Sequence, residues 1–313
     1  MSKYFDGKDQ TFMSPELKEN GRHMVMTNVQ PDIKIKYVNI DTRFQEDYNM
    51  QNYADVTFKL PQQISNVKSI KMTNIEIPAS FYPFSLRRRN TYFSITENSS
   101  PSITTVIRIA DRSYTKEDLI EAINDALTGT GITIGGYPEE LNLPGETYKL
   151  MFDNNSPDRN YTLHFNVDEE GNVDKNNLKS KLGWCLGFRE TTYILNSTKE
   201  IVSEAILSLN PFYYLYVSVD DFHSNNPNSF IAPSVQSYMN PNILARVSID
   251  PLSYSFGGLI VANRISGKLL SDTRTYEGKS DIQKLRIQIL DEFGVVVDLN
   301  QMDFAFALEI VYV

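Results

Sequence analysis

Three histidines and a single cysteine carry the most versatile chemistry in this 313-residue chain. His223 closes the run Asp-Asp-Phe-His at residues 220–223, and carboxylates and imidazoles are ligand types that metal ions accept. A metal site needs further ligands, and the sequence around His23 and His164 supplies none. The run is therefore interpreted as a polar turn after a strand. No metal and no cofactor is expected.

Cysteine chemistry is limited to Cys185, which stands between Trp184 and Leu186. An apolar setting keeps a thiol protonated and inert, so Cys185 is interpreted as a core residue. One cysteine cannot form an internal disulfide, which excludes the secreted disulfide scaffolds and indicates a reducing compartment. The sequence also lacks the nucleophile elbow, the zinc-protease helix, the P-loop and the dinucleotide-binding glycine pattern. No catalytic residue is assigned, and the protein is predicted not to be an enzyme.

Two acidic runs could supply paired carboxylates. Residues 168–170 precede Gly171 and are typical of a solvated hairpin tip. Asp291 and Glu292 precede Phe293 and Gly294, which predicts a turn that fixes strand register rather than a carboxylate site. Acid–base work usually requires burial or a charged neighbour, and the sequence indicates neither here.

Arg87, Arg88 and Arg89 form the only basic cluster, directly after the aromatic run at residues 81–84. Basic and aromatic side chains together can contact nucleic acid or anionic lipid. The formal net charge of −9 argues against nucleic acid as a partner. A solvated loop tip or a contact with another subunit is favoured instead. No stretch of 18 apolar residues is present, so no membrane span is expected.

Residues 1–30 are polar and aperiodic, without the apolar region of a secretory signal. They are interpreted either as a disordered leader or as an arm that orders against a neighbouring subunit. Tyr4, Phe5 and Phe12 would give such an arm something to bury, and they join the three arginines as candidate interface residues.

Alternating apolar and polar residues predict ten or more strands. Separate strands are expected at 33–40, 54–60 (ended by Pro61), 67–77, 91–96, 103–109, 148–152, 161–167, 205–209, 211–219, 243–249 and 259–265. Residues 115–127 predict a helix with Thr115 as its N-cap and Gly129 just beyond its end. Residues 174–182 predict a second, shorter helix, so residues 111–190 are expected to form a small α/β insertion.

The C-terminal residues 281–313 read as strand, turn, strand, turn, strand, after a polar linker at 266–280. Residues 295–297, three valines, are expected to form the middle strand. Phe304 and Phe306 share one face of the last strand, and that face is predicted to be buried. Many short strands with few helices favour a β-sandwich or barrel over residues 31–313.

Three blocks of sequence carry a resemblance to a known group of proteins. They are residues 37–44 (YVNIDTRF), 182–189 (LGWCLGFR) and the C-terminal block from 281 to 304, with LDEFG at 290–294 and VDLN at 297–300. Together they resemble jelly-roll minor capsid and penton proteins of the nucleocytoplasmic large DNA viruses, the giant viruses. The resemblance implies a mainly β fold, a jelly-roll β-sandwich interrupted by the α/β insertion.

The resemblance implies a structural role in an icosahedral capsid. The partners would be the major capsid protein and other capsid subunits, with a homopentamer if the chain is a penton. The location would be the virion, after assembly in the host cytoplasm. The alternative is a receptor- or carbohydrate-binding β-sandwich on the virion surface. Exposed aromatics cannot be claimed for it from the sequence, because Phe212, Tyr213, Tyr214 and Tyr216 are predicted to be strand core.

Overall fold

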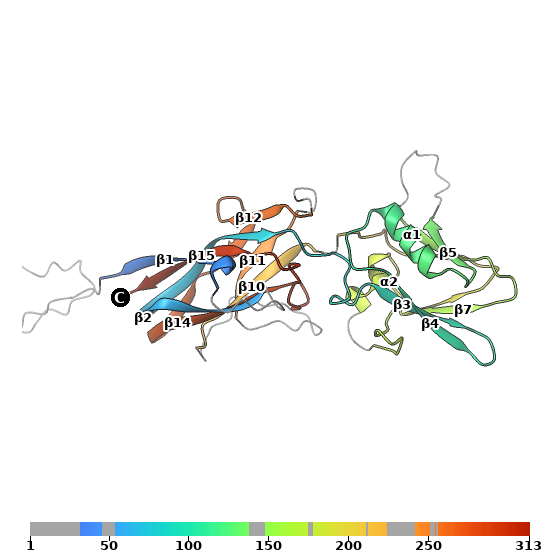
Figure 1. Ribbon diagram of the computed structural model, residues 1–313, viewed down its shortest axis with the longest axis horizontal. Helices are drawn as coiled ribbons and strands as arrows, with labels where there is room; N and C mark the ends of the chain where they lie inside the picture. Colours follow the sequence, from blue (N-terminus) through green and yellow to red (C-terminus); the bar gives the residue numbers. More distant parts are fainter. Residues whose placement is uncertain are drawn as a thin grey trace, which may run out of the picture.

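The computed structural model describes residues 32–45, 54–137, 148–174, 178–210, 212–223, 242–250, 254 and 256–313. Figure 1 shows two units side by side along the long axis. One hydrophobic core joins residues 40–81 to residues 212–310, and a second core is built from residues 84–207. We call residues 32–81 with 212–313 the split unit, and residues 84–210 the inserted unit. The predicted arm, residues 1–30, lies outside the described residues.

The split unit is built on one antiparallel sheet of eight strands. Its path runs β1-β15-β2-β14-β10-β11-β13, and β12 pairs with β2. The strands are β1 (Lys34–Asp41), β2 (Asp55–Pro78), β10 (Tyr214–Asp220), β11 (Ile243–Ser248), β12 (Leu259–Asn263), β13 (Leu269–Ser271), β14 (Arg274–Leu290) and β15 (Ala305–Tyr312). The first described strand thus pairs with the last, so both ends of the described chain are held in the sheet (Figure 1).

The register of this sheet explains its core. Ile40 lies opposite Phe306, and Phe306 lies opposite Ile75, and all three side chains are buried. Phe304 stacks near Phe306 with ring centroids 6.0 Å apart. The predicted buried face of the last strand is therefore confirmed.

Three secondary-structure predictions for the split unit were wrong. β2 continues through Pro61, because the ladder to β14 shifts register between Ile282 and Lys284 and so tolerates a residue without an N–H. Residues 266–280 are not a linker, since they form β13 and the start of β14. The valines at 295–297 make only an isolated bridge, between Val296 and Leu290, instead of a strand.

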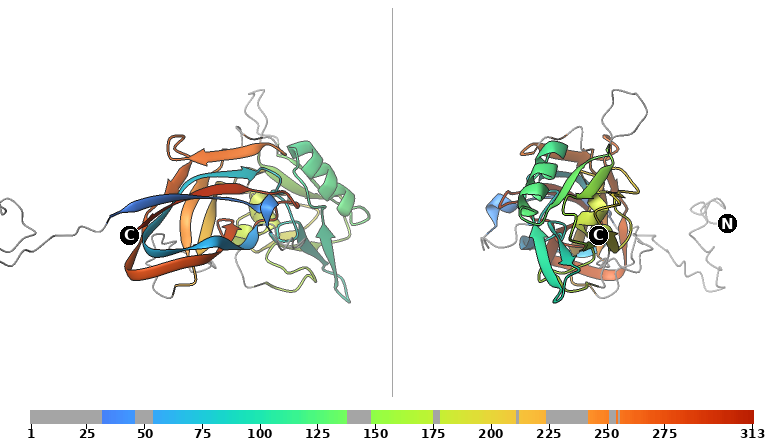
Figure 2. Two further views of the ribbon diagram at one scale, coloured as in Figure 1. Left: turned by 60° about the vertical axis from the view of Figure 1, so that its left-hand side comes forward. Right: turned by 90° about the vertical axis from the view of Figure 1, so that its right-hand side faces the viewer.

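The inserted unit holds two smaller antiparallel sheets, in the orders β4-β3-β7-β8 and β5-β6-β9. Its strands are β3 (Tyr92–Glu97), β4 (Ile103–Arg108), β5 (Ile132–Gly136), β6 (Leu150–Asn154), β7 (Tyr161–His164), β8 (Thr192–Leu195) and β9 (Ile201–Val202). Figure 2 shows helix α1 (Lys116–Ala126) on the outside of this unit, and Leu119 and Ile123 bury its inner face. Antiparallel sheets and few helices confirm the predicted fold class.

The two predicted helices had opposite outcomes. Thr115 caps α1 as predicted, because its hydroxyl accepts the N–H of Asp118 at 3.1 Å. The helix predicted at 174–182 is wrong. A 3-10 turn, η2 (Leu178–Ser180), and the four-residue α2 (Leu182–Cys185) stand there instead. Asp174 is drawn into an ion pair with the buried Lys181, 2.6 Å away.

The bounds of the α/β insertion, 111–190, stay a prediction as a domain division. The hydrogen bonding favours wider bounds, because β3 pairs with both β4 and β7. Ile95 and Ile107, on strands before residue 111, belong to the inserted core. We therefore propose an insertion from about residue 84 to residue 210.

Candidate functional site

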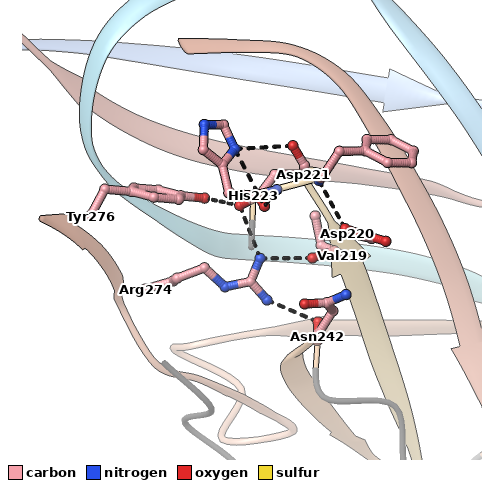
Figure 3. Close-up of polar contacts among 8 residues, drawn as sticks. Val219, Asp220, Asp221, His223, Asn242, Arg274 and Tyr276 are labelled. Atoms are coloured by element: carbon pink, nitrogen blue, oxygen red, sulfur yellow. Dashed lines mark hydrogen bonds and ion pairs between the residues drawn. The ribbon is translucent and has the colours of Figure 1, made fainter. Parts of the chain in front are cut away.

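The Asp-Asp-Phe-His run leads into a buried polar cluster of the split unit (Figure 3). The Asp221 side chain is fully buried and accepts hydrogen bonds from Arg274 Nη1, at 3.3 Å, and from the Tyr276 hydroxyl. Arg274 also donates to the carbonyls of Val219 at 2.7 Å and Asn242 at 2.9 Å. Burial and the Asp221 charge raise the pKa of Tyr276 far above its ordinary value, so its hydroxyl stays protonated and donates.

The remaining members of the run form the predicted turn. The N–H of His223 donates to the Asp221 carboxylate at 3.1 Å, and the N–H of Phe222 donates to Asp220 at 2.8 Å. Phe222 has φ of +61° and is 54% exposed, an unusual conformation for a bulky residue. Within the described part of the chain, no group of acidic, histidine and cysteine side chains could hold a metal ion. The Arg274 guanidinium and the Tyr276 hydroxyl, both on β14, bind the Asp221 carboxylate that follows β10. The cluster therefore ties β10 to β14.

A second polar cluster joins the two units and contains one of the predicted interface residues. The Arg88 guanidinium lies 3.1 Å from Glu292 and 3.7 Å from Asp291, on the turn after β14. It also sits 3.7 Å above the ring of Phe212. Only 8% of the Arg88 side chain is exposed. Arg88 therefore fastens the inserted unit to the split unit.

The two carboxylates of this cluster are more buried than the sequence indicated. Asp291 and Glu292 do form the expected turn, but their side chains are only 4% and 13% exposed. Burial raises the pKa of both carboxyl groups, and the nearby Arg88 only partly opposes it. Within the described residues, Arg88 Nη1 and Glu292 Oε2 are buried without a hydrogen-bond partner. Two acids facing one guanidinium give a cluster with excess buried negative charge.

Sequence reasoning placed these acids in a turn but missed their burial against Arg88, because this partner lies more than 200 positions away. The only local sign of this burial was that the two adjacent acids directly follow a strongly apolar strand.

The other arginines of the basic cluster have different surroundings. Arg89 is 58% exposed and lies 3.7 Å from Asp174 of the inserted unit. Arg87 lines the same pocket as Arg88, between the two units. Contact of Arg87 and Arg89 with a partner stays a prediction. The other three candidate interface residues, Tyr4, Phe5 and Phe12, lie outside the described residues.

Cys185 lies in the inserted core as predicted. It is 4% exposed, and burial raises its pKa to about 11, which keeps it a thiol at neutral pH. Trp184 beside it lies under the guanidinium of Arg189, 4.0 Å from its ring. Cys185 therefore packs as a protonated core residue of the inserted unit.

Strand β1 combines an open sheet edge with exposed apolar side chains. It ends the path of the large sheet, and no described strand pairs with its other edge. Ile33, Ile35 and Tyr37 are 66%, 57% and 65% exposed. A free edge beside apolar side chains is a site where another chain can add a strand.

Comparison with known proteins found no matching family model and no matching curated sequence. The solved structures that are similar include the following two. The mavirus penton protein is 12% identical with a TM-score of 0.39, over 90% of this chain and 100% of that chain. A chain of the Sputnik virophage structure is 11% identical with a TM-score of 0.39, over 90% of this chain and 98% of that chain.

None of the helices within the described ranges has the length and apolar character that a membrane span requires.

Proposed function

We propose that this chain is a structural subunit of an icosahedral large DNA virus capsid, a minor capsid or penton protein that contacts neighbouring capsid subunits. The observation that carries the proposal is the exposed apolar row beside the free edge of β1. A subunit of a shell must present such surfaces, whereas a solitary protein usually protects its edge strands.

The three resembling sequence blocks support the same role from their places in the fold. Residues 37–44 include the second half of β1, with the exposed Tyr37 and Asn39, and the turn that follows it. Residues 182–189 contain α2 and the inserted core around Cys185. Residues 281–304 contain the second half of β14 and the acids that bind Arg88. The resemblance therefore covers both units and the contact between them.

The polar clusters described above support a non-enzymatic role. Asp221 is bound by Arg274 and Tyr276, and Asp291 and Glu292 face Arg88. These side chains hold strands and units together, and a structural subunit needs that rigidity. The partners would be the major capsid protein and other capsid subunits, with five copies around a vertex if the chain is a penton. The protein would be located in the virion shell after assembly in the host cytoplasm.

Purified virions test the proposal. We expect peptides of this chain in the capsid fraction and, in a symmetry-averaged reconstruction, density for the split unit within the icosahedral shell. Placement at the five-fold vertex would identify a penton, and placement between capsomers a minor capsid protein. Absence of the chain from the shell would refute both.

One observation favours the alternative of a receptor- or carbohydrate-binding module on the virion surface. Tyr213, predicted to be strand core, is 66% exposed, and Phe222 and Phe256 are also more than half exposed. Exposed aromatic rings are the usual platforms for sugars and for protein anchors. Binding of the soluble chain to a glycan array would support this alternative if Tyr213→Ser or changes in residues 223–241 abolish it.

A further inference from the structure

The backbone of β1 has one row of hydrogen-bonding groups without a described partner. The N–H of Thr42 donates to the carbonyl of Phe304 at 3.1 Å, and these two residues continue the register by one position beyond its last pair, Asp41 and Ala305. Hydrogen-bonded pairs alternate along an antiparallel ladder. The even-numbered residues of β1 therefore bond to β15, and Ile35, Tyr37 and Asn39 direct their N–H and C=O groups to the open edge.

The same three residues project their side chains to the outer face. Ile35 and Tyr37 are 57% and 65% exposed, and Asn39 is exposed as well. The Tyr37 hydroxyl donates to Glu309 at 3.1 Å, which holds the ring along the sheet. Lys34 and Lys36 alternate on the opposite face and leave the open backbone row unobstructed. An added strand would meet unpaired backbone and apolar side chains together.

The other open edges are less suited to a partner. β13 ends the same sheet path but has only three residues. In the inserted unit, β4 carries Thr104 and Thr105 among its exposed residues, and β8 has four residues. Among the described strands at the ends of sheets, β1 is the longest, with eight residues.

We propose that the first 31 residues of a second copy of this chain add a strand to the open edge of β1. The segment precedes β1 directly, so every copy carries both the donor and the acceptor. Figure 1 shows β1 beginning at the end of the molecule that lies away from the inserted unit, close to the C-terminus. Thirty-one residues can span up to about 100 Å when extended, enough to cross to a neighbouring subunit.

The sequence of the segment fits this acceptor. Residues 24–31 (MVMTNVQP) are its longest uncharged stretch, and Phe12 lies further upstream. Their apolar side chains would lie beside Ile35 and Tyr37. Gln30 precedes Pro31, and a residue before proline favours extended backbone, which disfavours an immediate turn onto the same copy's β1. This inference goes beyond the proposed function, because two copies can exchange segments in solution without a capsid.

Disulfide cross-linking between two differently tagged full-length copies tests the proposal. One copy carries Asn39→Cys at the acceptor edge, and the other carries Phe12→Cys, Met24→Cys or Met26→Cys in turn. The native Cys185 is buried and stays a thiol, so it contributes little background. We expect a cross-linked heterodimer from at least one arm position. Cross-links that form only when both cysteines are in one copy would overturn the proposal, and so would none at all.

Three further variants separate pairing from folding. Asn39→Pro removes an N–H that points to the open edge, and should abolish the dimer in light scattering while the melting temperature stays close to that of the unmodified chain. Val38→Pro is the matched control, since its N–H bonds to β15, and it should lower the melting temperature. Deletion of residues 1–31 should leave a folded monomer. A dimer that survives this deletion or Asn39→Pro would overturn the proposal.

Discussion

The inserted unit and the split unit are both antiparallel β structures, but the chain builds their cores in different ways. The inserted core comes from one continuous segment, residues 84–207. The split core joins residues 40–81 to residues 212–310, and its buried pairs include Ile40 on β1 and Phe306 on β15, the first and last strands described. Long-range pairs are costly in loop entropy and slow to form. The inserted unit can therefore fold before the split unit is complete.

The contact between the units differs from both cores. Phe81 and Phe212 meet edge to face at 4.7 Å where the chain leaves and re-enters the split unit. Beside them, the buried Arg88 faces two acids. The cores thus depend on apolar packing, whereas the contact depends on charge, and the two should respond differently to mutation and to pH.

The largest expected effect is on the split core. Phe306→Ala removes a fully buried ring and should lower the free energy of unfolding by about 3–5 kcal/mol. Val311→Ala, on the partly exposed face of the same strand, is the matched control and should cost far less. Chemical denaturation followed by far-ultraviolet circular dichroism measures both. Equal losses in the two variants would contradict the assignment of the buried face.

Removal of the buried guanidinium should have the next largest effect. Arg88→Met leaves Asp291 and Glu292 buried without their counter-charge, and should cost about 3 kcal/mol at neutral pH. Arg43→Met breaks an ion pair with Asp41 whose arginine is 67% exposed and screened by solvent, and should cost much less than Arg88→Met. Denaturation midpoints at pH 7 compare the two. A small cost for Arg88→Met would show that the contact does not depend on this charge.

Because two buried acids face one arginine in the contact between the units, the stability of the folded chain should depend on pH. A carboxyl whose pKa is raised in the folded state binds its proton more tightly there, so its contribution to stability is lost as pH rises through the raised pKa. Asp291→Asn keeps an oxygen for the N–H groups of Phe293 and Val295 but removes the titration. Relative to the unmodified chain, this variant should gain stability as pH rises from about 4 to 7. An unchanged pH profile would contradict the buried-acid assignment.

The smallest expected effect lies in the inserted unit. Thr115→Ala removes the side-chain cap of α1 and should cost about 1 kcal/mol. Thr115→Asn restores an accepting oxygen and should recover most of the loss. Thermal denaturation of the three proteins checks the order. A loss that Asn does not recover would assign Thr115 another role.

Features set by neighbouring residues could be predicted from the sequence. The Thr115 cap, the turn at residues 291–294 and the shared face of Phe304 and Phe306 all depend on spacings of a few residues. Features set by distant residues could not. Arg88 was predicted to be a surface contact, because nothing near it reveals that Asp291 and Glu292 fold against it.

The errors in secondary structure have the same origin. Pro61 was expected to end a strand, but a register shift in β14, more than 200 positions away, accommodates it. The helix expected at 174–182 is replaced because Lys181 is buried and takes Asp174 as its partner. In both cases a tertiary contact outweighs the local preference.

One measurement tests most directly whether the chain has two separately built cores. Trp184 is the only tryptophan and belongs to α2 of the inserted unit, so its fluorescence follows that unit alone. In the Phe306→Ala variant, urea denaturation followed by circular dichroism should begin at lower denaturant, while the midpoint of the Trp184 transition stays where it is in the unmodified chain. A Trp184 midpoint that shifts together with the circular dichroism would show a single cooperative core and contradict the account.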